Sequence, residues 1–200
     1  MKKHIGLVCC FSVLFSGCLN LNLKQMLPDV KDYDLNTTGF TTPTCSQIHD
    51  IGLIGIQSAD LYDTKQIVFK NAQGQVYYAK HTKFIDLPKN MLKNMLLLQA
   101  AKHCLFISRP PHITTPYATI KLDILSLAIL DQNGQYQAQL VLDYSLNTPL
   151  GSQYRRITQS QTITAKESDE ILEIKALQHV SLKAITEILE QIKNADETKH

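Results

Sequence analysis

The 200-residue sequence is poor in several features that would point to a particular class of protein. It contains no tryptophan, only 8 glycines, and no apolar run longer than the 11 residues from Ile5 to Phe15. Because a helix needs about 20 apolar residues to cross a hydrocarbon core, the sequence predicts no transmembrane helix. We therefore expect a globular body rather than an integral membrane protein.

Motifs that mark common catalytic and metal sites are also missing. The chain has no Gly-rich phosphate loop, no His-Glu-x-x-His, no Cys-x-x-Cys and no Gly-x-Ser-x-Gly. Most histidines are scattered singly, without the spacing of metal ligands. His103 precedes Cys104, but neighbours on a helix point about 100° apart, which is poor geometry for a base and its nucleophile. We expect no enzyme, no metal and no cofactor beyond a covalent lipid.

The N-terminus has the layout of a secretory signal peptide. A short basic start precedes the apolar residues 5–15, and small residues follow at the expected cleavage site. The sequence from Leu14 to Cys18, Leu-Phe-Ser-Gly-Cys, resembles a bacterial lipobox, although Phe15 stands where Leu is usual. This resemblance implies cleavage before Cys18 and attachment of diacylglycerol and an N-acyl chain to that residue. A plain secretory signal cut near the same place is the alternative.

Cleavage before Cys18 would divide the chain into a signal peptide (1–17), a lipidated tether (18–30) and a single periplasmic α+β domain (31–200). The signal peptide holds 2 of the 20 basic residues and none of the 18 acidic ones. The mature chain would therefore have a net charge near zero. Such a balance argues against nucleic acid as a partner, because phosphate binding depends on a basic footprint.

Five cysteines reduce to three once the signal peptide is removed. Cys18 is committed to lipid, which leaves Cys45 and Cys104 together in an oxidising compartment. A bond between them would close a loop and so stabilise the fold by roughly 3–4 kcal/mol in the chain-entropy model. Two buried free thiols are the alternative, because sequence does not show whether the sulfur atoms come within bridging distance.

Patterns in the first half predict four strands and a helix. We expect a short strand at 31–35, a buried central strand at 51–56 that is apolar on both faces, and a hairpin formed by 66–70 and 75–84. A proline at the first-turn position then opens an amphipathic helix over residues 88–104.

The second half is the more strand-like. Strands at 119–129 and 137–146 are joined by Asn133-Gly134, a strong hairpin signal, and a polar strand at 153–164 is expected near an edge. A helix from Glu170 to about Lys193 has an apolar stripe at helical spacing. The stripe consists of Ile171, Ile174, Leu177, Val180, Leu182, Ile185, Ile188, Leu189 and Ile192. We expect an α+β fold, a single mainly antiparallel sheet with two long helices packed on one face.

Arg155 and Arg156 lie together on the predicted edge strand. Such a pair can contact a lipid headgroup or a protein partner, and it can also guard an edge against unwanted strand pairing. Both arginines are therefore candidate contact residues.

Several segments together resemble a known family. A strand of the Gln-Ile-Val type begins at Gln66, and a hairpin return leads to the sequence Phe84-Ile85-Asp86-Leu87-Pro88 and a helix. A strand of the Arg-x-x-x-x-Ser kind around 156–161, where Arg155 and Ser160 have this spacing, and an apolar C-terminal helix complete the pattern. With the lipobox, these features resemble the ABC-type transport auxiliary lipoproteins, the group that contains the Pqi-type lipoproteins. The family often has Trp where this chain has Phe84.

This resemblance implies a non-enzymatic accessory, or adaptor, subunit of an ABC/MCE-type intermembrane lipid transport system. Its partners would be an MCE-domain protein and an ABC permease and ATPase. The resemblance implies no particular oligomeric state for this chain. Leu19, rather than Asp, follows the lipidated cysteine. In enteric bacteria this favours the periplasmic face of the outer membrane. The alternative function is another envelope-assembly lipoprotein, serving lipopolysaccharide export or a cell-wall synthase.

Overall fold

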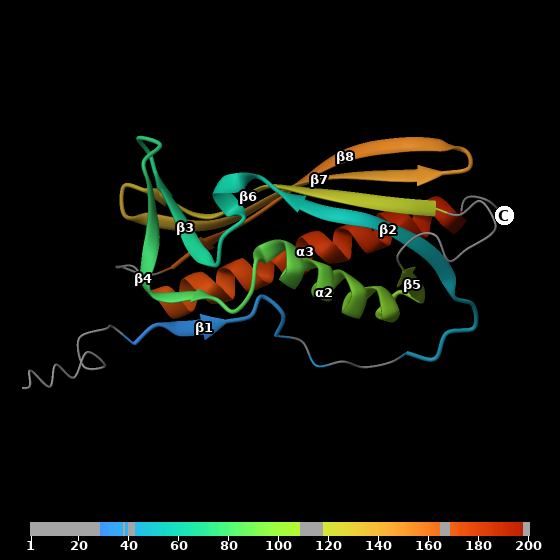
Figure 1. Cartoon of the computed structure of the whole chain (residues 1–200), viewed down its shortest axis with the longest axis horizontal. Helices are drawn as coiled ribbons and strands as arrows, with labels where there is room; N and C mark the ends of the chain where they lie inside the picture. The colour runs from blue at the N-terminus through green and yellow to red at the C-terminus, as the bar shows by residue number, and fades with distance from the viewer. Residues whose placement is uncertain (1–28, 38, 40–42, 109–117, 165–168, 198–200) are drawn as a thin grey trace, which may run out of the picture.

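The structure is a computed structural model of the chain, and it describes residues 29–37, 39, 43–108, 118–164 and 169–197. The predicted signal peptide and most of the predicted tether, Cys18 included, lie outside these residues. Within the described part, a long sheet lies over two helices that run side by side along one of its faces (Figure 1).

Among the described residues, the sheet has eight strands, and two long helices and one short 3-10 turn accompany it. The strands are β1 (Lys31–Tyr33), β2 (His49–Ser58), β3 (Gln66–Asn71), β4 (Val76–Phe84), β5 (Leu105–Ser108), β6 (Ala118–Gln132), β7 (Gln135–Thr148) and β8 (Gly151–Ile163). The helices are α2 (Pro88–Lys102) and α3 (Glu170–Glu197), and the 3-10 turn is η2 (Asp60–Tyr62).

The strand β6 is the centre of the sheet. On one side it pairs with β7 in an antiparallel ladder, and β7 pairs with β8 in the same way. On the other side β6 has two parallel neighbours, β2 along its first half and β3 along its second. Beyond these lie β5, parallel to β2, and the antiparallel hairpin partner β4, with β1 outermost. The α+β class and the mainly antiparallel sheet are confirmed, with parallel pairs added at one side.

The core lies between the sheet and the helices. In β6, Ile120, Leu122 and Ile124 are fully buried, whereas Lys121 and Asp123 between them are partly exposed on the other face. Burial that alternates from one residue to the next is typical of a strand that has one face in the core and the other toward solvent. The helix α3 packs against β7 and β8, and α2 packs against β2 and β5.

The apolar stripe of α3 faces the core, as predicted. Leu177, Ile185 and Ile188 are each 0% exposed. The prediction is wrong at Ile171, which is 50% exposed. At this first turn the Glu170 carboxylate accepts hydrogen bonds from the backbone N–H groups of Lys80 and His81, at 3.2 and 3.1 Å. Glu170 thus faces β4, and the neighbouring side chain of Ile171 points elsewhere.

Two other details differ from the sequence prediction. The helix α2 ends at Lys102, and the apolar residues after Cys104 form the short strand β5, which we did not predict. Cys104 has a φ of 58°, in the left-handed region that turns the chain from helix to strand. Burial of residues 51–56 is incomplete because a bulge between Leu53 and Gly55 leaves Ile54 56% exposed.

Truncation of the α3 stripe should destabilise the fold. For Ile185→Ala we expect a loss of about 3 kcal/mol in the free energy of unfolding, because its side chain is fully buried against the sheet. Lys183→Ala, at an exposed position on the same helix, is the matched control and should change stability by less than about 0.5 kcal/mol. Denaturant unfolding measures both. An unchanged Ile185→Ala would mean that the stripe contacts a partner instead.

Candidate functional site

The structure joins Cys45 and Cys104 in a disulfide. Their Cα atoms are 5.6 Å apart and the sequence separation is 59 residues. The bond ties the segment before β2 to the residue before β5, and the backbone N–H of His49 donates to the Cys104 carbonyl at 3.1 Å beside it. Of the two alternatives left by the sequence, bonded cysteines or free thiols, the structure contains the bonded form.

His103 and Cys104 do not act together as a catalytic base and its nucleophile. The sulfur of Cys104 is bonded in the disulfide, so this residue has no free thiol. His103 caps the C-terminus of α2, where burial lowers the pKa of its imidazole and the charge of Glu190 opposes this shift. The pair is therefore structural.

Arg155 and Arg156 point to opposite sides of β8, as neighbours on a strand must. Arg156 lies opposite Asp143 of β7, and its Nε and Nη2 donate to the two carboxylate oxygens at 2.7 and 2.8 Å. These bonds hold the pKa of Asp143 below its usual value and raise the pKa of Arg156. The guanidinium of Arg156 is thus already paired within the chain.

The face of the sheet opposite the helices forms a shallow polar hollow of about 590 Å³. Besides the Arg156–Asp143 pair, it contains Lys121, whose Nζ lies 3.1 Å from Asp123 Oδ1. Arg155 also lines the hollow, so three cations and two anions lie there, and four of these five groups form the two ion pairs. A set of polar groups whose charges are mostly paired within the chain suits contact with a polar protein surface better than capture of a phosphate group.

On the helix side, a polar network connects α3 to β7 and β8. The hydroxyl of Tyr144 donates to Gln191 Oε1, and the Gln191 amide donates to Glu187 at 3.2 Å. Gln159 of β8, largely buried, donates to the other Glu187 oxygen at 2.6 Å. Burial raises the pKa of Tyr144. This network fixes the position of the helix along the sheet.

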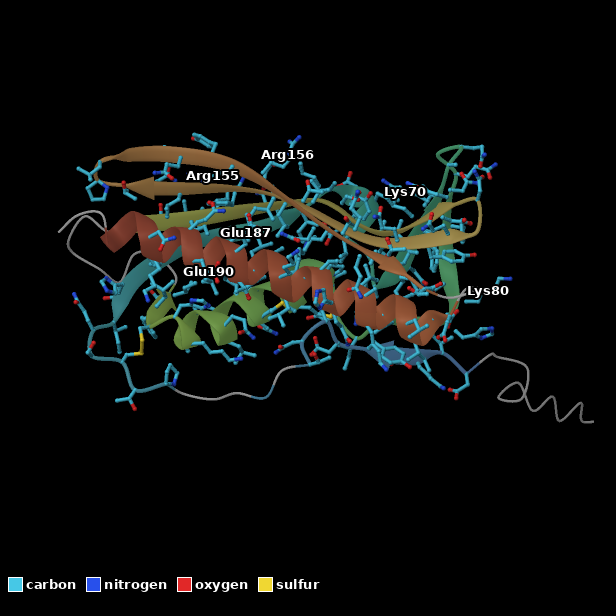
Figure 2. All side chains as sticks on the ribbon, turned by 180° about the vertical axis from the view of Figure 1, so that it is seen from behind. Lys70, Lys80, Arg155, Arg156, Glu187 and Glu190 are labelled. Atoms are coloured by element: carbon cyan, nitrogen blue, oxygen red, sulfur yellow. A yellow bond between two sulfur atoms is a disulfide. The ribbon has the colours of Figure 1, made fainter. Side chains whose placement is uncertain are left out.

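Arg155 lies beside this network. It is the register partner of Tyr144, and Figure 2 shows it on β8 above the part of α3 that carries Glu187 and Glu190. Its side chain is exposed. Of the two arginines predicted as contacts, Arg155 is therefore the one available to a partner.

Sequence reasoning missed the Arg156–Asp143 pair, although a signal for it exists. The turn between β7 and β8 places Thr148 opposite Gly151, and counting back along both strands from there brings Asp143 opposite Arg156. The network of Tyr144, Gln191 and Glu187 joins a strand to a distant helix. No local pattern in the sequence indicates it.

Among the described residues, no group of three or more His, Cys, Asp or Glu side chains could hold a metal ion. In the same part of the chain, no helix has the length and apolar character needed to cross a membrane.

The Arg156–Asp143 pair gives a pH prediction. We expect Arg156→Ala to raise the pKa of Asp143 toward its ordinary value of 3.8, as measured by NMR titration of the carboxyl carbon. Because the folded-state pKa lies below the unfolded one, the stability contributed by the pair is present above the unfolded pKa and lost as pH falls through the folded pKa. The difference in melting temperature between wild type and Arg156→Ala should therefore shrink in acid. Thr158→Ala, on the same face without a charge, should leave the pKa unchanged.

No family model matches this sequence, and no curated protein matches it. Solved structures do. A protein of the DUF330 family model from Xanthomonas campestris is similar with a TM-score of 0.65 and 12% identity, over 87% of this chain and 98% of that one. A structure described as an uncharacterized protein has a TM-score of 0.63 and 11% identity, over 82% of this chain and 99% of that one.

A structure described as a minor lipoprotein from Acinetobacter baumannii is similar over 74% of this chain and 94% of that one, at 10% identity. Its TM-score of 0.44 is too low to support an argument. At these identities the stronger matches establish the fold alone. The chain therefore shares its fold with the DUF330 protein of Xanthomonas campestris.

Proposed function

We propose that this chain is a lipid-anchored accessory subunit, an adaptor, of an ABC/MCE-type intermembrane lipid transport system. In this proposal Cys18 carries the lipid, the body faces the periplasm, and the anchor lies in the outer membrane. The adaptor binds an MCE-domain protein that works with an ABC permease and ATPase, and it performs no chemistry on the lipid.

The observation that supports this proposal most is the lipobox from Leu14 to Cys18 in front of a folded body. Between Cys18 and the first strand at Lys31 lie about a dozen residues, which span roughly 40 Å if extended. A body on such a tether reaches well beyond the headgroups of its own membrane. This reach suits a protein that contacts a partner in the periplasm.

The surfaces of the body also suit an adaptor. The helices cover one face of the sheet and leave the other face, with its two ion pairs, exposed. Within the described residues β8 pairs only with β7, so its outer edge is open, and Arg155 is exposed there. Exposed polar surface of this kind is typical of non-obligate interfaces.

The assignment to an MCE-type system rests on the resemblance of particular segments. These residues form consecutive parts of the fold: β3 begins at Gln66, Phe84 ends β4, and Pro88 begins α2. Phe84, in the aromatic position of the resemblance, is 2% exposed. The early part of the resemblance thus covers one continuous structural unit, a hairpin followed by a helix.

The test is a pull-down with an MCE-domain protein from the same organism. Purified mature protein should retain it, with an interface of standard size, about 1,600 Å². Arg155→Glu should weaken retention, whereas Lys175→Glu, an equal charge change at an exposed position on α3, should not. A parallel assay should detect no phospholipid hydrolysis.

Other results of these two assays would contradict or replace parts of the proposal. Absence of binding to the MCE-domain protein would remove the transport-adaptor proposal. Binding to a lipopolysaccharide-export component or a cell-wall synthase would replace it with the alternative envelope function. Phospholipid hydrolysis would contradict the assignment as a non-enzyme.

A further inference from the structure

Among the described strands, one stretch of β2 has no partner on its outer edge. Within the part of the chain that the structure describes, β5 pairs only with residues 49–52 of β2, and β4 lies beyond β3 at the other end of β6. Figure 1 shows β4 and β5 at opposite ends of the molecule, with β2 crossing between them above α2. Among the described strands, none pairs with the outer edge of β2 along residues 53–58.

A hollow of about 640 Å³ lies at this open stretch. One wall is residues 53–58 of β2, and the other is formed by Lys89, Asn90 and Lys93 on the first turns of α2. Six residues of strand measure roughly 20 Å, so the open edge is long enough for one ordinary strand. Ile54, displaced by the bulge and 56% exposed, provides an apolar contact at its mouth.

The charged side chains of the hollow have one sign. Lys89 and Lys93 line it, and none of the lining residues is acidic. The ammonium of Lys89 lies 2.8 Å from Asp63 Oδ2, so this charge is partly neutralised. Lys93 is half-buried, and no hydrogen bond or ion pair of its ammonium occurs within the described residues. Its positive charge is therefore available to an occupant of the hollow.

We propose that residues 53–58 of β2 form a strand-addition site for an extended, acidic segment of a partner protein. The backbone of the segment hydrogen-bonds to the open edge, and alternate side chains point toward the lysines of α2. The inference rests on the proposed adaptor function, because it assigns a backbone contact for the same partner in addition to the side-chain contact at Arg155. For strand pairing this edge is favoured over β8, since the hollow that Tyr154, Arg155 and Arg156 line extends over β7 and β6 on the face of the sheet and does not lie between a strand edge and a helix.

The test uses three synthetic peptides and the mature protein in detergent. The first is an acetylated octapeptide in which valine and threonine alternate with glutamate. The second has lysine in place of each glutamate, and the third is the glutamate peptide with alternate backbone amides methylated. Amide hydrogen exchange reports where each peptide protects the protein.

We expect the glutamate peptide to slow exchange within residues 53–58 about tenfold at saturation. The lysine peptide should protect weakly, because it meets like charges. The methylated peptide should not protect at all, since it keeps the side chains but loses donors needed for strand pairing. Lys93→Glu should weaken binding of the glutamate peptide about fivefold and strengthen that of the lysine peptide. Lys175→Glu is the matched control and should change neither.

Protection of β8 instead of β2 would overturn the proposal, as would equal binding of the methylated peptide or no protection by any peptide. Repeating the pull-down with Lys93→Glu separates this inference from the proposed function. If the MCE-domain protein binds the wild type and the variant equally, the adaptor function stands and the strand-addition site is wrong. If the glutamate peptide protects β2 but the MCE-domain protein does not bind, the site stands and the partner assignment is wrong.

Discussion

Cys18→Ser is expected to abolish fatty-acid labelling and to leave an unprocessed precursor. The diacylglycerol is joined through a thioether, so the reaction needs the cysteine sulfur, and a serine hydroxyl does not replace it. The apolar segment before it, residues 5–15, would then stay attached to the body. The variant should therefore migrate more slowly on a gel and carry no label.

Metabolic labelling with a clickable fatty acid measures this directly. Cys45→Ser is the matched control, because it removes a cysteine of the folded body and should keep full labelling. Equal labelling of Cys18→Ser and wild type would refute lipidation at this residue. A wild type that is cleaved but never labelled would show that the plain secretory alternative is right.

Removal of the disulfide should have a large effect on the stability of the fold. For the double variant Cys45→Ala with Cys104→Ala we expect the free energy of unfolding to fall by about 4 kcal/mol, because the bond closes a 59-residue loop in the unfolded chain. Guanidinium unfolding under oxidising conditions measures the loss. Ala101→Ser, three residues before Cys104 and partly exposed, is a control for local disturbance and should cost much less.

Reduction of the wild type should give the same loss as the double variant. If the double variant were as stable as wild type, the two cysteines would not constrain the unfolded chain. If reduction destabilised the protein and the double variant did not, the effect would come from the free thiols rather than from the lost bond.

Local signals were enough to predict most of the secondary structure. Asn133-Gly134 marks the β6–β7 hairpin, Pro88 begins α2, and the stripe of α3 correctly places Leu177 and Ile185 in the core. These features depend on neighbours in sequence, so a single chain reveals them. The pairing of Asp143 with Arg156 follows from one turn and could have been predicted as well.

The features that escaped prediction depend on contacts between distant parts of the chain. The strand β5 has only four residues, and its pairing with β2 has no local signal. The parallel pairing of β2 and β3 with β6 likewise joins segments that have β4, α2 and β5 between them in the sequence. For the candidate site, sequence identified Arg155 and Arg156 but not that Asp143 neutralises one of them. The open edge of β2 becomes visible only when β5 is seen to be short.

The placement of the disulfide changes the topology through which the chain must fold. In the register of the sheet, Ile51 of β2 pairs with Ala118 of β6, 67 positions later in the sequence. With Cys45 and Cys104 joined, the path between these two residues runs 6 positions back to one cysteine and 14 onward from the other. Loop-closure entropy grows with the logarithm of length, so this shortcut lowers the cost of the first contact by about 1 kcal/mol. The oxidised chain therefore has a lower effective contact order than its sequence suggests, and its central parallel pair should form faster than in the reduced chain.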